Sequence, residues 1–216
     1  PVEPFFKGDK TRPITATPAV GIAPAGVTDL APIRTGALEK THPVMVFFGS
    51  GRLLADADKA ASIVNRFYGV YDDGSKIGLT EANLTEQQRT YSTATARVYQ
   101  NDLEVGYTRS AGATKRGWYI ALPDDGERVI DRALVKGELV YFNTILPDTS
   151  TCDAGGKGWE NVVQMSNGGS AKGAQWDVNQ NGSLYAGDTH AGLSFAGRKT
   201  AKGQPGAPKI IGHQLF

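Results

Sequence analysis

The sequence lacks several features that would narrow its class at once. Its single cysteine, Cys152, excludes a disulfide within these 216 residues. The thiol could still pair with a cysteine elsewhere, so the redox compartment stays open. No apolar run approaches the roughly 20 residues that a membrane-spanning helix needs. The 23 basic and 22 acidic residues leave a formal net charge of +1, so neither a nucleic acid nor an anionic membrane is indicated as a partner.

Signals for a catalytic centre are also scarce. The three histidines, His42, His190 and His213, have no metal-ligand spacing among them, and we expect His190 to be a surface side chain. No Gly-x-Ser-x-Gly elbow is present, which argues against a hydrolase with a catalytic triad. The Gly-Ser-Gly at 49–51 is not followed by Gly-Lys-Ser/Thr, so it does not predict a phosphate-binding loop.

One acidic cluster, Asp124, Asp125 and Glu127, could supply the paired carboxylates used in glycoside hydrolysis. Because Gly126 lies among these residues and strand-like segments flank them, we predict a solvated hairpin turn instead. A dedicated active site is therefore not predicted, and binding is favoured over catalysis.

What the sequence does contain is glycine, proline and many short apolar segments. The 27 glycines and 11 prolines are spread through the chain, and the apolar stretches are rich in Val, Ile, Tyr and Phe, which suits β-strands. The strongest predicted strands are 42–51, 66–72, 116–123, 137–147 and 159–165. We also expect an edge strand at 12–20, a short helix within 56–65, and three tryptophans in the core, namely Trp118, Trp159 and Trp176.

Short strands joined by turns predict an all-β fold, a partial β-propeller built of antiparallel four-stranded blades with long loops. At roughly 40 to 50 residues per blade, the chain would hold about four or five blades at most. That number is too small for the commoner closed rings, and the sequence starts at Pro1 without an initiator methionine. We therefore expect a piece of a longer protein.

The most informative stretch is 177–188, DVNQNGSLYAGD. Oxygen-bearing side chains stand at positions one, three, five and twelve, with glycine at six and an aliphatic residue at eight, as in an EF-hand-type calcium loop. The predicted Ca²⁺ ligands are Asp177, Asn179, Asn181, Ser183 (through its backbone carbonyl) and Asp188. Because only two of them are charged, we expect weak affinity. The alternative is an Asn/Gly-rich turn that holds no ion.

Several stretches, taken in order, resemble one family, the C-terminal β-propeller domain of the PilY/PilC type IV pilus biogenesis factors and tip adhesins. The matching stretches are PFF, RPITATPAV, VMVFFGSGRLL, FYGVYD, GWYIALPDDGERVI, VYFNTILPDTSTCDAGGKGW and WDVNQNG. They come in the order of the family and cover most of residues 4–182. The resemblance implies that residues 1–216 are the C-terminal part of such a propeller domain, preceded by further blades and the N-terminal part of the parent protein.

The resemblance implies a non-enzymatic protein that is secreted across the inner and outer membranes to the cell surface or pilus tip. Such proteins act with minor pilins to promote pilus extension, and they contribute to twitching motility, virulence and attachment to host cells or abiotic surfaces. Calcium binding by propeller loops is implied to regulate the balance between extension and retraction. Asn181 departs from the aspartate of the family pattern. The alternatives are a periplasmic quinoprotein-like or carbohydrate-active propeller enzyme, and a structural module without an ion.

Overall fold

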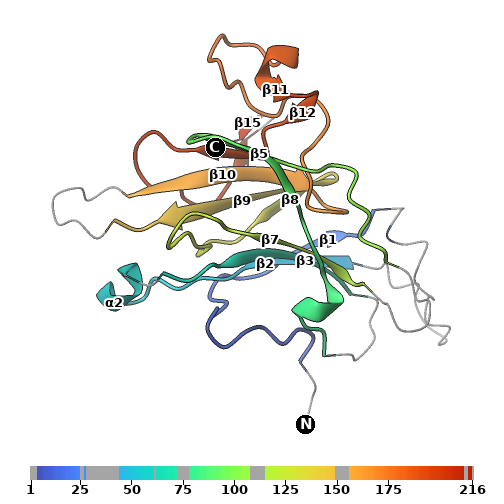
Figure 1. Cartoon of the computed structure of the whole chain (residues 1–216), viewed down its shortest axis with the longest axis vertical. Helices are drawn as coiled ribbons and strands as arrows, with labels where there is room; N and C mark the ends of the chain where they lie inside the picture. The colour runs from blue at the N-terminus through green and yellow to red at the C-terminus, as the bar shows by residue number, and fades with distance from the viewer. Residues whose placement is uncertain are drawn as a thin grey trace.

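A computed structural model describes residues 4–24, 27, 44–60, 62–72, 78–107, 115–148, 156–211 and 214–215. Two β-sheets lie against each other as two layers, and helical segments are short (Figure 1). The predicted all-β class is therefore confirmed. Within the described ranges, no helix has the length and apolar character needed to cross a membrane.

The first sheet contains five strands, in the order β1 (Ala19–Ile22), β2 (Val44–Gly49), β3 (Arg66–Asp72), β7 (Gly117–Ala121) and β4 (Thr85–Glu86). Neighbouring strands run antiparallel except β4 and β7, which are parallel. Strands β2, β3 and β7 fall within the predicted apolar runs. The edge strand begins at Ala19 rather than at residue 12, because Pro13 and Pro18 have no N–H to donate to a ladder.

The second sheet contains six antiparallel strands, in the order β5 (Arg89–Ser92), β6 (Ala96–Tyr99), β13 (Gly197–Lys199), β10 (Lys157–Gln164), β9 (Leu139–Leu146) and β8 (Leu134–Lys136). Two small hairpins pair β11 (Thr189–His190) with β12 (Leu193–Ser194), and β14 (Ile210–Ile211) with β15 (Gln214–Leu215). The sheets thus hold five and six strands. The four strands predicted for each blade are not reproduced, and the described residues form no closed ring.

Helical segments are brief and lie in connections. Helix α2 (Asp56–Lys59) realises only the first part of the helix predicted within 56–65. Two short 3₁₀ helices, η1 (Glu81–Asn83) and η2 (Ala186–Asp188), precede β4 and β11. The remaining connections are turns and irregular segments, in keeping with the many glycines and prolines.

The main core fills the space between the two sheets. Phe67 of the first sheet stacks on Phe142 of the second, with ring centroids 3.7 Å apart. Trp118 is fully buried beside them, and its indole N–H donates to the carbonyl of Met165 at 2.9 Å. Gly69 makes room for this indole, since a β-carbon there would lie 2.4 Å from the ring. Like Trp118, Trp159 and Trp176 are buried, so the core assignment of all three tryptophans is confirmed.

A buried ion network joins the two sheets. Arg97 of β6 donates two hydrogen bonds of 2.9 Å to the carboxylate of Glu127, which lies in the segment after β7. The side chains are 1% and 0% exposed. The guanidinium also donates to Asp124 at 2.7 Å and lies 3.6 Å above the ring of Trp159. Because Arg97 belongs to the second sheet and Glu127 follows the first, this network ties the sheets together.

Asp124 receives further donors from the second sheet. The ammonium of Lys199 lies 2.8 Å from its Oδ2, and the indole N–H of Trp159 donates to the same oxygen at 3.0 Å. Partial burial opposes ionisation of Asp124, but Lys199 and Arg97 outweigh it and hold the pKa of this carboxyl below its usual value of 3.8. The carboxylate is therefore stabilised in its charged form.

The segment 124–127 forms the predicted turn, closed by the N–H of Glu127, which donates to the carbonyl of Asp124 at 3.0 Å, but the turn is largely buried rather than solvated and belongs to no hairpin. Glu127 is fully buried and Asp124 is tied into the ion network, which leaves only Asp125 exposed. The chain also does not turn back along β7, because Arg128 forms a bridge with Ile145 of the second sheet. Since their oxygens are taken up by cations, Asp124 and Glu127 do not form a carboxylate pair poised for glycoside hydrolysis.

We expect Gly69→Ala to lower the free energy of unfolding by about 1–3 kcal/mol, because the added methyl group would overpack the core against Trp118. Urea denaturation followed by tryptophan fluorescence measures this change. Gly206→Ala is the matched control, since nothing lies within 4 Å of a β-carbon there, and it should change the value by less than about 0.5 kcal/mol. Equal denaturation midpoints for the two variants would contradict the packing assignment.

We expect Asp124→Asn to lower the free energy of unfolding by about 1–3 kcal/mol at pH 7, because a neutral amide weakens the charged hydrogen bonds from Arg97 and Lys199. The pKa of Asp124 is lowered in the folded state, so its contribution is fully present above the unfolded value and disappears as the pH falls below 3.8. The difference between parent and variant should therefore shrink in acid.

Denaturation at pH 7 and in a series of acidic buffers measures this difference. The neighbouring Asp125→Asn is the control, because that side chain is exposed and its loss should matter by less than about 0.5 kcal/mol. A penalty for Asp124→Asn that stays constant down to strongly acidic pH would overturn the ionic role.

Candidate metal centre

The predicted calcium loop, residues 177–188, projects from the outer side of the second sheet, away from the first (Figure 1). At its start, Trp176 is buried, and the guanidinium of Arg198 lies 4.7 Å above the indole. At its end, the short helix η2 leads directly into β11. The loop is thus anchored at both ends and open to solvent between them.

Asp188, at position twelve, closes the loop at its base. Its side chain is fully buried, and its carboxylate accepts the backbone N–H groups of Val178 at 2.9 Å and Asn179 at 3.2 Å. The second oxygen accepts the N–H of Tyr185 at 3.3 Å. One carboxylate therefore joins the beginning of the loop to its end.

The ligands predicted at positions one, three and five turn toward the same stretch of backbone. Asp177 accepts the N–H of Asn181 at 3.1 Å and that of Gly182 at 2.7 Å. Asn179 accepts the same N–H of Asn181 at 3.1 Å, and Asn181 accepts the N–H of Ser183 at 2.9 Å. The oxygens of Asp177 and Asn179 thus converge on one N–H, that of Asn181, whereas the oxygen of Asn181 lies at the N–H of Ser183.

Two backbone conformations produce this tight winding. Gln180 has φ of 58° and Gly182 has φ of 84°, so the left-handed region is used twice within three residues. Asn179 is also oriented, because its amide nitrogen donates to the hydroxyl of Tyr185 at 2.9 Å. Its oxygen therefore points to the loop interior rather than to the tyrosine.

The donor set fits calcium better than other metals. It consists of two carboxylates, two amide oxygens and a backbone carbonyl, the hard oxygen ligands that Ca²⁺ prefers. Both oxygens of Asp177 and the Oδ2 of Asp188 accept one N–H each and keep a second lone pair for a cation, whereas the Oδ1 of Asp188 accepts two N–H groups. In the described part of the chain there is no group of three or more His, Cys, Asp or Glu side chains that could hold a metal, so a metal site in this loop depends on neutral oxygens. Calcium binding itself stays a prediction.

The other residues singled out from the sequence lie apart from this loop or have structural partners. His190 is half-buried in β11 and stacks on Tyr91, with ring centroids 3.7 Å apart, so it is only partly the surface side chain expected. Ser50 is fully buried, and its hydroxyl donates to Asn65 at 3.2 Å, which gives it a structural role. His42, Cys152 and His213 lie outside the described residues.

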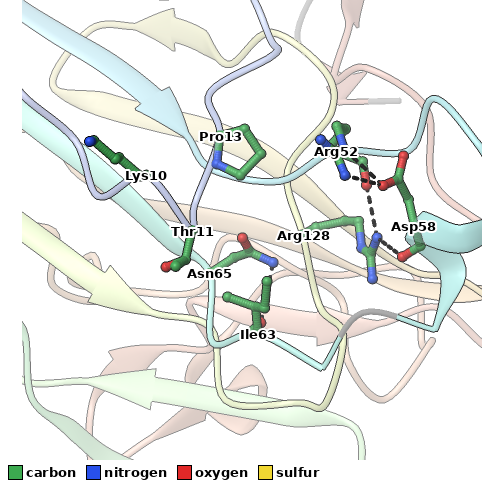
Figure 2. Close-up of a pocket in the computed structure, with 8 residues that line it drawn as sticks. All are labelled: Lys10, Thr11, Pro13, Arg52, Asp58, Ile63, Asn65 and Arg128. Atoms are coloured by element: carbon green, nitrogen blue, oxygen red, sulfur yellow. Dashed lines mark hydrogen bonds and ion pairs between the residues drawn. The ribbon is translucent and has the colours of Figure 1, made fainter.

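The sequence did not predict a second feature, a cavity of about 180 Å³ beside α2, whose Asp58 forms part of the lining. Its lining residues are drawn in Figure 2 and comprise Lys10, Thr11, Pro13, Arg52, Asp58, Ile63, Asn65 and Arg128. These residues are far apart in sequence and share no motif. Only the folded chain brings them together, so no sequence signal could have found the cavity.

Comparison with known proteins identifies relatives that are type IV pilus biogenesis factors. No protein-family model matches the chain. The type IV pilus biogenesis factor PilY1 homolog of Xylella fastidiosa is 32% identical over 136 residues, or 60% of this chain. The type IV pilus biogenesis factor PilY1 of Pseudomonas aeruginosa is 28% identical over 167 residues, or 65% of this chain. The chain spans only 9% and 14% of the lengths of these two relatives.

A comparison with solved structures also finds a protein of this kind, with a similar fold. The crystal structure of the Pseudomonas aeruginosa PilY1 C-terminal domain matches with a TM-score of 0.68 and 21% sequence identity. The match covers 93% of this chain and 42% of that domain's chain. The resemblance predicted from the ordered motifs is therefore confirmed: this chain is similar, in sequence and in fold, to the C-terminal domain of the PilY1 pilus biogenesis factors.

Proposed function

We propose that this chain is the C-terminal part of a type IV pilus biogenesis factor, a non-enzymatic domain carried to the cell surface or pilus tip. The observation that supports this most strongly is the similarity to relatives named as PilY1 pilus biogenesis factors, at 28% to 32% identity. The domain promotes pilus extension, twitching motility and surface attachment through contacts with minor pilins and with host or abiotic surfaces. The N-terminal part of the same parent protein is a further partner of this domain.

The two sheets are two neighbouring blades of a larger propeller in this proposal. Their face-to-face packing through Phe67 and Phe142 is the way in which adjacent propeller blades bury their apolar faces. The chain covers 42% of the solved C-terminal domain, which leaves room in the complete domain for further blades.

The loop at 177–188 binds Ca²⁺ through Asp177, Asn179, Asn181, Ser183 and Asp188. The ion neutralises the two carboxylates and adds metal–oxygen bonds to a winding that is already held by hydrogen bonds from backbone N–H groups to the aspartate side chains. With two charged ligands, the dissociation constant is on the order of 10⁻⁴ to 10⁻³ M, the range of extracellular calcium modules. Calcium acts here as a structural clamp, because the loop offers no group that could carry out a reaction.

The same loop exposes apolar side chains to solvent. Val178, Leu184 and Tyr185 are 36%, 59% and 50% exposed, although residues of this kind are usually buried. A rigid loop that projects from the sheet and exposes such groups suits contact with another protein or surface. Calcium would thereby set the shape of a contact region for pilins or attachment targets.

We expect isothermal titration of CaCl₂ into the purified chain to release or absorb heat with a dissociation constant on the order of 10⁻⁴ to 10⁻³ M. Asp177→Ala should abolish this heat, because it removes one of the two charged ligands. Asp102→Asn is the matched control, since this exposed carboxylate lies outside the loop and its loss should change nothing. Equal heats for the parent and Asp177→Ala, or no heat from the parent, would remove the site.

We expect deletion of residues 1–216 from the parent protein to abolish surface pili and twitching. Electron microscopy counts the pili, and the diameter of the twitching zone measures motility. Parent protein with Asp102→Asn serves as the control and should support normal piliation. Normal pili and attachment after the deletion would contradict the pilus assignment, whatever the outcome of the calcium titration.

A further inference from the structure

The sequence contains two Asn-Gly pairs, Asn167-Gly168 and Asn181-Gly182, and the second lies in the projecting loop. An asparagine followed by glycine loses its side-chain amide more readily than other pairs, because glycine leaves its own nitrogen uncovered and its backbone free to bend. Both asparagines form Asx turns, in which the side-chain oxygen accepts the N–H two residues later. The atoms that would react nevertheless meet different partners in the two places.

In the projecting loop, the side chain of Asn181 is folded back over the peptide that follows it. Its Oδ1 accepts the N–H of Ser183 at 2.9 Å, which bends Cγ toward the nitrogen of Gly182 and polarises the side-chain carbonyl toward attack. The N–H of Gly182 donates to the carboxylate of Asp177 at 2.7 Å, a group that is able to take up its proton. Asn181 and Gly182 are both exposed, so water reaches them.

The amide group that would leave is also free to do so. Within the described part of the chain, the Nδ2 nitrogen of Asn181 has no hydrogen-bond partner. A nucleophile, a proton acceptor, a polarised carbonyl and an unrestrained leaving group therefore meet at this one peptide.

The buried pair shares the Asx turn but not the other features. Asn167 is 8% exposed, and its amide nitrogen donates to the carbonyl of Asn101 at 2.8 Å. The N–H of Gly168 donates to the backbone carbonyl of Gln164 at 2.9 Å, and an amide carbonyl is too weak a base to take up its proton. Gly168 also lies against Trp118, since a β-carbon there would be 2.4 Å from the ring, so the backbone has little room to bend.

We propose that Asn181 is a site of spontaneous deamidation in the folded chain. The nitrogen of Gly182 attacks Cγ of Asn181, its proton passes by way of Asp177 to the departing Nδ2, and ammonia leaves. The resulting succinimide ring is opened by water, which breaks one of the two C–N bonds of the ring. The product is aspartate or, where the chain then continues through the side chain, isoaspartate. Either product adds one carboxylate to the loop, and the reaction consumes only water.

The aspartate product places a third carboxylate in the loop, at position five of the calcium pattern. This consequence rests on the calcium binding proposed above, whereas the deamidation itself does not. Asn181→Asp should bind Ca²⁺ about tenfold more tightly than the parent in the same titration, because a further ligand is charged. Equal affinities would contradict this consequence, and an absence of heat from both proteins would contradict calcium binding, while neither result bears on the reaction at Asn181.

Peptide mapping by mass spectrometry tests the reaction on the purified chain, kept folded in a calcium-free, mildly alkaline buffer. We expect the peptide with Asn181 to change with time from the mass of the amide to that of the acid. The peptide with Asn167 should change at least about tenfold more slowly, because its groups are held away from the geometry of attack. In urea the two pairs lose their different surroundings and should react at similar rates. No deamidation of Asn181 in the folded chain, or equal rates for the two folded pairs, would overturn the proposal.

Two variants separate the role of Asp177 from that of the Asn-Gly pair. Asp177→Asn should slow the reaction at least about tenfold in the folded chain and leave it unchanged in urea, because the carboxylate acts only where folding holds it beside Gly182. Asn181→Gln keeps an amide on a longer side chain, so the acidic form should disappear on isoelectric focusing. Asp102→Asn, which alters an exposed carboxylate outside the loop, should leave the rate at Asn181 unchanged. An undiminished rate in folded Asp177→Asn would overturn the part assigned to this carboxylate.

Discussion

The pairing of Arg97 with Glu127 is the interaction on which the joining of the two sheets depends. Each charge is almost completely removed from water, and each would be costly to bury without the other. The observed placement of the segment after β7 brings Glu127 to Arg97 and lets Arg128 form a bridge with Ile145. Because separating the two partners would leave each charge buried and unpaired, the pair disfavours placements of this segment that move Glu127 away from Arg97.

Contacts from this network extend to the projecting loop. Lys199 binds Asp124 on the inner side of β13, and the preceding Arg198 pairs with Glu160 at 2.7 Å on the other side of the strand. The same Arg198 lies over Trp176, the residue that anchors the start of the loop. Strand β13 thus contributes Lys199 to the buried ion network and Arg198 to the base of the projecting loop.

How much of the structure could be predicted from the sequence depends on whether each feature is formed by residues close together in the chain. Strands β2, β3, β7, β9 and β10 were predictable because each holds several β-branched or aromatic residues within a few positions. The residues of 177–188 lie together because they are consecutive in the chain. The burial of Glu127 was not predictable, since its partner Arg97 stands on another strand. The number of strands per sheet also escaped prediction, because short strands such as β4 and β13 have weak patterns and pair with distant partners.

The closure of the loop by Asp188 has a consequence for how this region can change. Because its carboxylate bonds directly to the N–H groups of Val178 and Asn179, the two ends of the loop are fixed next to each other independently of the residues between them. Substitutions or short insertions at the tip therefore leave the packing of the two sheets unchanged. Related chains could diversify this tip under selection while keeping one scaffold, and a foreign peptide grafted there would be displayed without redesign of the core.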